Sequence, residues 1–346
     1  MLEGLFHLPY ELFLAKKAFV AFNEVKNCGY LKKGKYKLHL YGKPIVYNIN
    51  VGEIKDKYPA KYFCFFNKII LNNKSNLKKI FQADYIMVLS EGEYKLFDLT
   101  NKLIYTKISE NKKKIIISGQ KRFKDFFNTT IIGEDDEGIF EKYIDYIPSF
   151  KFRSEDRILL LEEIFYSYIY YARYCHDSNI ISDQMSLKQI ISLCNSQLCD
   201  YTKKLIKCIS ENFHIPSIYQ HGDMHFGNIL NDGKKTYLID FERYSKDLFF
   251  YDILNCCYVE AVDNGKWDLI EWYISNETNS NSLLDMLFSE MGVKFDSKKK
   301  RDYFALFMLR RLYADSLRAS KGITKNNFDY ILKKNRVILK WLEEQA

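Results

Sequence analysis

The pattern that most restricts the fold is a change of periodicity near Pro148. From about residue 34 to residue 145, apolar and polar residues alternate in short runs such as "KPIVYNINVG" and "EYKLFDLTN", with turn residues between them. Because strand side chains point alternately to the two faces of a sheet, these runs predict a mainly antiparallel sheet. "LTNK", Leu99 to Lys102, is typical of a hairpin turn. "SGQKRFKDFF" predicts a short helix with three phenylalanines on one face.

After Pro148 the apolar residues recur at helical spacing over long segments. We expect four helices, over Asp156–Cys175, Met185–Ser210, Ser297–Ser316 and Phe328–Gln345. Two strand-like pieces, "SIYQHGD" and "KTYLIDFE", lie between the second and the third. At 346 residues the chain is long for a single core. The sequence therefore predicts an α+β protein with a sheet-rich N-terminal lobe and a mainly helical C-terminal lobe that carries a small sheet.

Composition and cysteine usage restrict the class of protein. Hydrophobic residues make up 47% of the chain, enough for a sizeable core. The eight cysteines are scattered with no C-x-x-C pair, which favours reduced thiols over a zinc site or a disulfide framework. At the N-terminus, Glu3, Glu11, Lys16 and Lys17 interrupt the apolar run, so neither export nor a membrane span is expected. These features predict a cytoplasmic protein.

Positive charge is concentrated at the N-terminus. Residues 1–80 hold 15 lysines against five acidic residues, while the net charge of the whole chain is +8. No nucleic-acid-binding motif accompanies these lysines, so no nucleic-acid partner is expected. A solvated lysine-rich surface is the simplest interpretation. Peripheral contact of residues 16–79 with an anionic membrane or glycan is the functional alternative.

The residues with the clearest chemistry lie in "HGDMHFGNIL" and in the "LIDFE" that follows it. Asp223 and Asn228 are five residues apart, and Asp240 comes twelve residues later, after the turn-like "NDGKK". Phosphoryl transfer needs a carboxylate that orients an attacking hydroxyl, together with oxygen ligands that hold Mg²⁺ against nucleotide phosphates. Asp and Asn supply such hard oxygen ligands.

This H-x-D-x-x-x-x-N spacing followed by D-F resembles the catalytic segments of the protein-kinase-like fold. More closely, "HGDMHFGNIL", "LIDFE" and the later "FFYDILN" resemble the aminoglycoside phosphotransferase and choline kinase superfamily. The resemblance implies Asp223 as the catalytic base and Asn228 and Asp240 as Mg²⁺ ligands. It also implies that His221, His225 and Asp252 support the catalytic loop. ATP and Mg²⁺ are the expected cofactors.

We expect three parts of the chain. The resemblance implies residues 81–147 as the nucleotide-binding lobe and residues 148–346 as the helical lobe with the catalytic loop and acceptor site. Residues 1–80 fall outside the resemblance and are expected to form a basic extension or an extra part of the N-terminal lobe. A metal site for Zn²⁺ or Fe²⁺ is a second interpretation of the motif. His221, Asp223 and His225 alternate along the chain in a way that allows chelation.

On the nucleotide side, the resemblance places Lys107 at the α- and β-phosphates, with Lys95 as the alternative. Gly92 is the single glycine of the preceding turn, so no glycine-rich loop is claimed, and backbone amides are expected to cradle the phosphates. Asp125 is the sole acid between Asn111 and Gly133 and therefore the expected partner of Lys107.

"GIFEKYIDYIP" resembles the fifth strand and hinge of the family. Phe140 and Glu141 stand at its end, and the backbone of Glu141 to Tyr143 is expected to bind adenine.

The expected reaction is transfer of the γ-phosphoryl group of ATP to a hydroxyl of a small molecule or glycan, with a sugar or surface-polysaccharide hydroxyl slightly preferred. An amino alcohol or an aminoglycoside is also compatible. Both of these acceptors are cations, and two sets of residues are candidates for binding them. For an aminoglycoside the candidates are the acids Glu260, Asp263 and Asp268, and for a choline-like cation they are the aromatic residues Tyr258, Trp267, Trp272 and Tyr273. The alternative from another class is a catalytically weak, nucleotide-binding regulatory or scaffold protein. The sequence does not predict the oligomeric state.

Overall fold

A computed structural model describes residues 34–40, 43–51, 85–89, 93–193, 199–210, 213–276, 278–320 and 325–344. The chain forms two compact units. The N-terminal unit comprises residues 1–117 and 130–145, and the C-terminal unit comprises residues 118–129 and 146–346. Most of residues 1–80, including the basic segment, lies outside the described residues, so its role stays a prediction.

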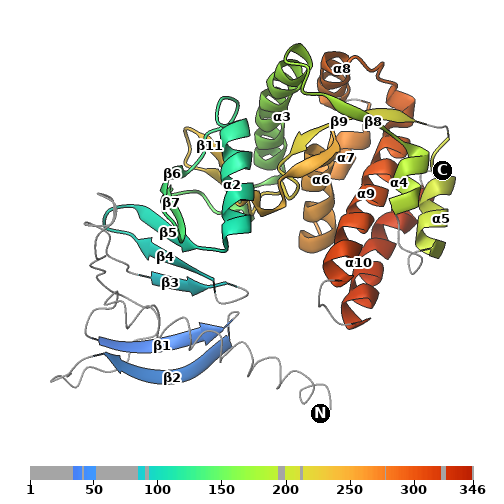
Figure 1. Cartoon of the computed structure of the whole chain (residues 1–346). Coiled ribbons are helices and arrows are strands. Elements are labelled where there is room, and N and C mark those ends of the chain that lie inside the picture. Colours follow the sequence, from blue (N-terminus) through green and yellow to red (C-terminus); the bar gives the residue numbers. More distant parts are fainter. Residues whose placement is uncertain are drawn as a thin grey trace. The chain divides into compact units, whose positions relative to one another are not determined.

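The N-terminal unit contains a five-stranded antiparallel sheet, which confirms the expected strand-rich lobe (Figure 1). Its strands follow the spatial order β3 (Tyr85–Val88), β4 (Tyr94–Asp98), β5 (Leu103–Lys107), β7 (Gly138–Lys142) and β6 (Ile131–Glu134). A separate hairpin pairs β1 (Gly34–Leu40) with β2 (Lys43–Val51).

The alternation of apolar and polar residues along the strands places the apolar side chains on the buried face of the sheet. Along β4, Tyr94 and Leu96 are buried, and Tyr105 of β5 packs against Phe140 of β7 with ring centroids 4.9 Å apart. The predicted hairpin turn joins β4 to β5. Asp98 fixes this turn, because one of its carboxylate oxygens accepts the backbone N–H of Asn101 at 2.8 Å.

Helix α2 (Glu110–Phe123) begins in the N-terminal unit, and its last residues, from Ser118, belong to the C-terminal unit. The helix that the sequence predicts for this region thus begins earlier than expected and ends at Phe123. Phe123 is fully buried and packs against Tyr171 of the C-terminal unit, with ring centroids 4.6 Å apart. The phenylalanine stripe therefore anchors the end of α2.

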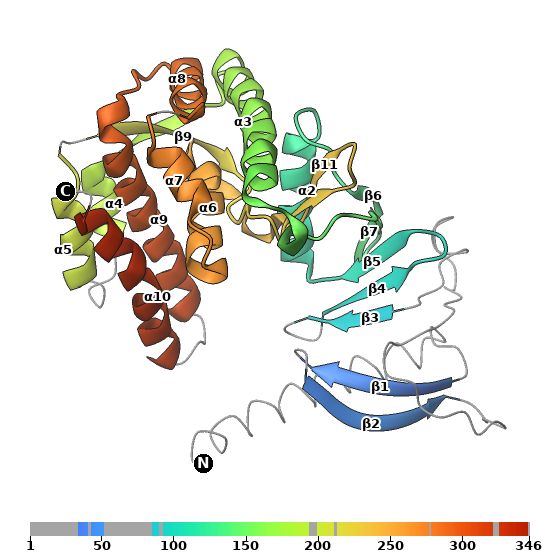
Figure 2. The same cartoon turned by 180° about the vertical axis from the view of Figure 1, so that it is seen from behind.

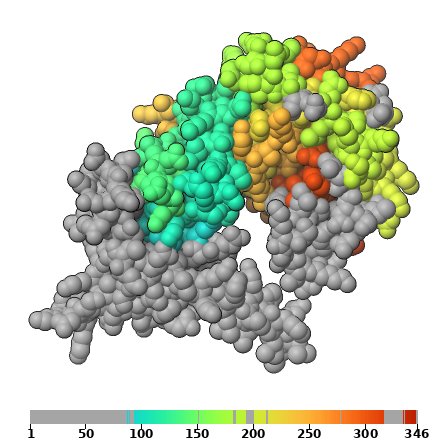
Figure 3. Space-filling view, viewed as in Figure 1, coloured from blue at the N-terminus to red at the C-terminus, as the bar shows by residue number. Residues whose placement is uncertain are grey.

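The C-terminal unit is mainly helical, as expected (Figure 2). Its longer helices are α3 (Ser154–Asp177), α6 (Tyr251–Asn264), α8 (Ser280–Glu290), α9 (Lys300–Ser320) and α10 (Lys325–Glu344). The shorter helices are α4 (Leu187–Leu193), α5 (Cys199–Lys207) and α7 (Asp268–Ile274). Helices α3, α9 and α10 lie where the periodicity predicts them. The space-filling view shows α3 and α8 beside each other at one edge of this unit (Figure 3), and an ion pair of 2.6 Å joins Arg173 of α3 to Glu290 of α8.

The prediction of one helix over Met185–Ser210 is wrong. Residues Ser182–Ser186 form a strand, β8, and two short helices follow it. β8 pairs with β9 (His214–Gln220), which in turn pairs with β12 (Ser245–Leu248) in an antiparallel three-stranded sheet. The hydrogen bonds to β9 stabilise an extended chain here, and local helical periodicity does not report such a distant partner.

The small sheet and a hairpin hold the motif region. β9 leads directly into the loop His221–Asn228, which we call the catalytic loop after the role that the resemblance implies. The hairpin of β10 (Ile229–Asn231) and β11 (Thr236–Leu238) follows it. Gly233, with φ of +85°, forms the predicted "NDGKK" turn of this hairpin. Among the described residues, no helix is long and apolar enough to cross a membrane.

Candidate active site

The catalytic loop is anchored to α6 through the carboxylate of Asp252. This carboxylate is fully buried and accepts the backbone N–H of His221 at 2.6 Å and that of Gly222 at 2.9 Å. The Tyr168 hydroxyl of α3 donates a third hydrogen bond to it. Burial raises the pKa of Asp252, and these donors oppose the rise because they stabilise the anion. The structure thus places Asp252 in the supporting position that the resemblance implies.

His221 ties the loop to the segment that precedes Asp240. Its Nε2 lies 2.8 Å from the Ile239 carbonyl, and its Nδ1 lies 3.3 Å from the backbone nitrogen of Asp223. A carbonyl only accepts and a backbone N–H only donates, so a neutral ring protonated at Nε2 satisfies both contacts. The ring also packs on Phe241 with centroids 4.4 Å apart. His221 is therefore a positioning residue whose two nitrogens are both engaged.

Gly222 is required by close packing inside the loop. Its φ is +81°, a conformation that strains other residues. A Cβ atom built at this position would lie 2.1 Å from the carbonyl oxygen of Arg243. The backbone of the loop and that of the residue three places after Asp240 are thus in direct contact.

Asp223 sits beside two guanidinium groups that the sequence analysis did not single out. The Oδ1 atom of Asp223 forms an ion pair with Arg243 and lies 3.7 Å from Nη1 of Arg311. Arg311 is buried in α9 and is fixed by Asp315, whose Oδ2 lies 3.3 Å from its Nε. Two arginines therefore orient one oxygen of Asp223. The "FER" that follows Asp240 was a signal for Arg243, but nothing local in the sequence links Arg311 to the loop.

The β10–β11 hairpin brings Asn228 and Asp240 together. Ile229 pairs with Leu238, and the ladder continues because the backbone N–H of Ile239 donates to the Asn228 carbonyl at 3.1 Å. The side-chain nitrogen of Asn228 donates to the Asp223 carbonyl at 3.0 Å, which fixes the orientation of the amide. Asp240 is exposed and adopts a left-handed backbone, with φ of 65°. Such a conformation costs about 1 kcal/mol or more in a residue other than glycine and is found preferentially at functional sites.

His225 lies inside the loop, where Gly227 donates its backbone N–H to Nδ1 at 3.0 Å. Burial lowers the pKa of His225, although Asp223 opposes the shift. The chelating arrangement of His221, Asp223 and His225 is not formed, because both nitrogens of His221 are occupied by the backbone. In the part of the chain that the structure describes, no group of three or more His, Cys, Asp or Glu residues is arranged to hold a metal ion. The Zn²⁺ or Fe²⁺ interpretation is therefore wrong for the described residues.

In the N-terminal unit, Lys107 ends β5, with its ammonium 5.7 Å from the centroid of the Tyr94 ring and 3.9 Å from the Glu137 carboxylate. Glu93 is buried beside β4, and its carboxylate lies 2.7 Å from the ammonium of Lys112 of α2. In this ion pair the acid lies beside the strand and the lysine lies on the helix, whereas the predicted pair has the lysine on the strand and the acid on the helix. Asp125 is exposed, just after the end of α2 in the C-terminal unit, and its pairing with Lys107 stays a prediction.

The predicted hinge lies at the end of β7. Phe140 is buried, and the Glu141 carboxylate accepts hydrogen bonds from Thr106 at 3.2 Å and Thr130 at 2.8 Å. The backbone N–H of Tyr143 donates to the Lys102 carbonyl at 2.8 Å. This N–H is already used inside the N-terminal unit, which leaves the Tyr143 carbonyl for the predicted contact with adenine, and that contact stays a prediction.

The two sets proposed to recognise a cationic acceptor are mostly structural. Of the acids, Asp268 pairs with Arg157 at 2.8 Å, and Glu260 is buried and accepts from Asn264 at 2.8 Å. Of the aromatic residues, three are buried in the core: Tyr258, Trp272 and Tyr273. Trp267 packs against Trp341 with ring centroids 6.3 Å apart. The aromatic cage is therefore wrong, because helical periodicity marks a buried face and cannot by itself distinguish a core from a binding site.

Comparison with known proteins points to the same segment of the chain. A family model described as the phosphotransferase enzyme family matches residues 199–274, a segment that contains the catalytic loop, the hairpin and Asp252. The resemblance predicted from the motif is confirmed for this segment of the chain. A comparison with curated proteins found no match.

Solved structures with a similar fold include a choline/ethanolamine kinase family protein from Mesorhizobium loti, 12% identical, with a TM-score of 0.42 over 75% of this chain and 88% of that one. Another is the amicoumacin kinase hAmiN in complex with AMP-PNP, Ca²⁺ and Ami, 12% identical, with a TM-score of 0.37 over 75% of this chain and 88% of that one. A third is an aminoglycoside phosphotransferase from Streptomyces rimosus in complex with ADP and streptomycin, 10% identical, with a TM-score of 0.32 over 65% of this chain and 92% of that one.

Proposed function

We propose that the protein is an ATP- and Mg²⁺-dependent phosphotransferase that moves the γ-phosphoryl group to a hydroxyl of a small molecule or glycan. The observation that carries this proposal is the arrangement of Asp223, Asn228 and Asp240. The Asn228 amide donates to the Asp223 carbonyl, and Ile239, the residue before Asp240, donates its backbone N–H to the Asn228 carbonyl. All of these residues lie within the segment that matches the phosphotransferase family model.

In the proposed reaction, Asp223 orients the acceptor hydroxyl and takes its proton. Arg243 contacts Oδ1, so we assign the hydroxyl to Oδ2. The neighbouring arginines contact Oδ1 and so hold the carboxylate in one orientation. This suits phosphoryl transfer, where alignment of the attacking oxygen matters more than full deprotonation before attack.

The residues around Asp240 have the chemistry that Mg²⁺ requires. Asn228 donates its side-chain nitrogen to the loop, so its amide oxygen is the atom available as a ligand. Asp240 is exposed and supplies carboxylate oxygens. Mg²⁺ is usually held by one or two protein ligands, with water and substrate phosphates completing the shell. When bound there, the ion would neutralise charge on the transferring phosphoryl group.

The acceptor is the least specified part of the proposal. The predicted sites for a cationic acceptor are mainly internal contacts, which leaves a sugar or surface-glycan hydroxyl as the preferred acceptor. An amino alcohol or an aminoglycoside would need another set of acidic or aromatic groups.

The test is a screen for transfer of labelled phosphate from ATP in Mg²⁺ to hydroxylated metabolites, sugars and glycans, with Asp223→Asn as the inactive control. We expect transfer to at least one acceptor by the wild-type protein and none by the variant. A protein that binds ATP, transfers phosphate to no acceptor and hydrolyses no ATP would instead be the nucleotide-binding regulatory protein.

A further inference from the structure

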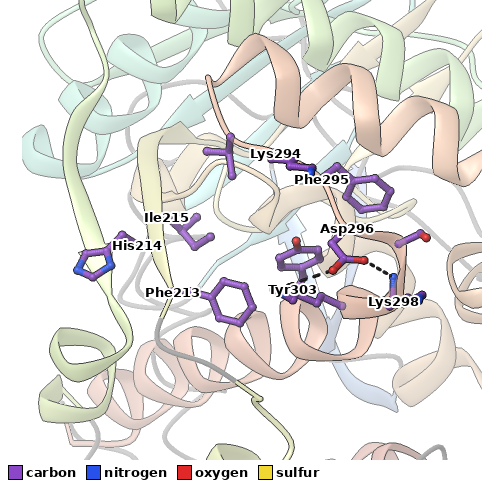
Figure 4. A pocket seen from close by; sticks show the side chains of 11 residues that line it. Phe213, His214, Ile215, Lys294, Phe295, Asp296, Lys298 and Tyr303 are labelled. Atoms are coloured by element: carbon purple, nitrogen blue, oxygen red, sulfur yellow. Dashed lines mark hydrogen bonds and ion pairs between the residues drawn. The ribbon is translucent and has the colours of Figure 1, made fainter.

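A pocket of about 650 Å³ lies in the C-terminal unit at the beginning of β9. It is formed by the first residues of β9, by the segment between α8 and α9, and by Tyr303 of α9 (Figure 4). β9 has seven residues and ends where the catalytic loop begins. At roughly 3.3 Å per residue the strand separates the pocket from the loop by about 20 Å. The pocket is therefore distinct from the proposed site of phosphoryl transfer.

Aromatic rings form one side of this pocket. Phe213 and Tyr303 lie with ring centroids 5.5 Å apart, and Phe295 stacks on Tyr303 at 6.1 Å with an interplanar angle of 28° (Figure 4). Phe295 is half-buried, and it also contacts Phe288 of α8 at 5.2 Å. Phe213 and Tyr303 are buried, and the Lys299 ammonium lies 5.7 Å from the centroid of the Phe213 ring. The half-buried Phe295, held in place by Tyr303 and Phe288, is therefore the ring that offers apolar surface to a ligand.

Lysines supply an excess of positive charge. Lys294, Lys298 and Lys299 line the pocket, and Asp296 is the only acid among its lining residues. That carboxylate already accepts the backbone N–H of Lys298 at 3.0 Å and lies 4.0 Å from the Lys299 ammonium. Lys294 and Lys298 are exposed, so their charges are available to a ligand. Three ammonium groups around one engaged carboxylate make the pocket electropositive.

We propose that this pocket binds an acidic saccharide, a sugar that carries a phosphate or a carboxylate. The C–H face of a sugar ring can pack against the exposed part of Phe295, and a phosphate or carboxylate forms charge-assisted hydrogen bonds with Lys294 and Lys298. The volume is within the range of small-ligand sites. The ligand is either a free sugar phosphate or the acidic unit of a larger glycan. This site is additional to the phosphotransferase site and does not depend on it.

The experiment measures binding to the full-length protein by saturation-transfer NMR and calorimetry, without nucleotide or metal. The probes are glucose 6-phosphate for a free sugar phosphate, a hyaluronan tetrasaccharide for an acidic glycan, and maltotetraose as the neutral counterpart. We expect at least one acidic probe to bind, with saturation transfer to its ring protons, and the neutral probe to bind more weakly. Tighter binding of the tetrasaccharide identifies a glycan, and tighter binding of glucose 6-phosphate identifies a free sugar phosphate.

The double variant Lys294→Ala/Lys298→Ala should weaken acidic binding roughly tenfold, because both charges are lost from the pocket. Lys188→Ala removes an exposed lysine of α4 outside the pocket and should bind as the wild type does. Both changes are at exposed side chains, and circular dichroism verifies that the variants are folded. No binding of either acidic probe, or equal binding by the double variant, would overturn the proposal.

Asp223→Asn separates this proposal from the proposed function. The variant should keep its acidic-saccharide binding even if it transfers no phosphate. Binding that is lost in this variant would place the ligand at the catalytic loop instead and would overturn the assignment to the pocket.

Discussion

The catalytic loop and the α8–α9 connection, Met291–Lys299, satisfy their polar groups in opposite ways. In the loop, the imidazoles of His221 and His225 and the amide of Asn228 bond to the backbone, and the Asp252 carboxylate of α6 accepts two successive N–H groups of the loop. In the connection, Lys294 and Lys298 extend into solvent beside a pocket. The comparison shows two uses of polar side chains. A side chain that fixes the geometry of a loop, such as Asp252, is hydrogen-bonded to several partners. A side chain proposed to attract a ligand by its charge, such as Lys294, is exposed to solvent.

The largest effect on activity is expected from Asp223→Asn, which tests whether the loop has a catalytic role. We expect kcat to fall by roughly 10²–10⁴-fold, because the amide cannot take the proton of the acceptor hydroxyl. Nucleotide affinity, measured by calorimetry, should remain within about twofold. Asp200→Asn, at an exposed position of α5, is the matched control and should leave kcat unchanged. A variant with wild-type turnover would refute the role of Asp223.

Asp252→Ala tests whether the loop depends on its buried anchor. Removing the carboxylate leaves the buried N–H groups of His221 and Gly222 without their acceptor, so the free energy of unfolding should fall by about 3 kcal/mol. Urea unfolding monitored by circular dichroism measures this change. Asp285→Ala, on the exposed face of α8, should cost less than about 0.5 kcal/mol. Equal losses of unfolding free energy for the two variants would mean that the Asp252 carboxylate does not stabilise the loop.

Gly222→Ala and Gly265→Ala separate backbone strain from close packing. Both glycines have positive φ, but an added Cβ meets the Arg243 carbonyl at position 222 and has nothing within 4 Å at position 265. We expect Gly265→Ala to cost about 1 kcal/mol and Gly222→Ala about 2 kcal/mol, with a loss of kcat only in the latter. Urea unfolding and steady-state kinetics measure the two quantities. Indistinguishable variants would show that the loop can move away from Arg243.

A pH-dependent effect is expected from Lys300, which begins α9 directly after the connection. Its buried ammonium donates to the Ser275 carbonyl at 2.9 Å and to the Ser280 hydroxyl at 3.1 Å. Burial lowers the pKa of Lys300 from 10.5 to about 8. Between pH 8 and 10.5 the unfolded chain therefore binds more protons at this site than the folded chain, and stability from this residue rises with pH by about 1–3 kcal/mol.

Lys300→Met should abolish that contribution, because the variant has no titrating group at this position. The measurement is the difference in urea-unfolding free energy between wild type and variant at pH 7.5, 9 and 10. Lys340→Met, on the exposed surface of α10, controls for the general effect of removing a lysine. A wild-type-minus-variant difference that does not change with pH would contradict the lowered pKa.

Local sequence predicted much of the fold because the relevant signals are local. The alternation in β4 and β5 and the turn between them follow from neighbouring residues, and so do α3, α9 and α10. The strand β8 was missed because its stability comes from pairing with β9, which is far away in the sequence. No periodicity within residues 182–186 reports that partner.

The same distinction applies to the site. Asp223, Asn228 and Asp240 were found because they lie within one loop and one hairpin. Arg311 was missed because the folding of α9 brings it to Asp223 across 88 residues of chain. Tyr258 and Tyr273 were wrongly proposed as a binding cage, because aromatic residues at helical spacing predict burial against any partner, and here the partner is the core.

The contact between Gly222 and the Arg243 carbonyl means that the loop and the segment after Asp240 cannot be redesigned one at a time. A bulkier residue at position 222 would displace Arg243, whose guanidinium contacts Asp223, the proposed base. An engineer who wants a new acceptor for this protein should therefore leave both backbones untouched and alter side chains elsewhere.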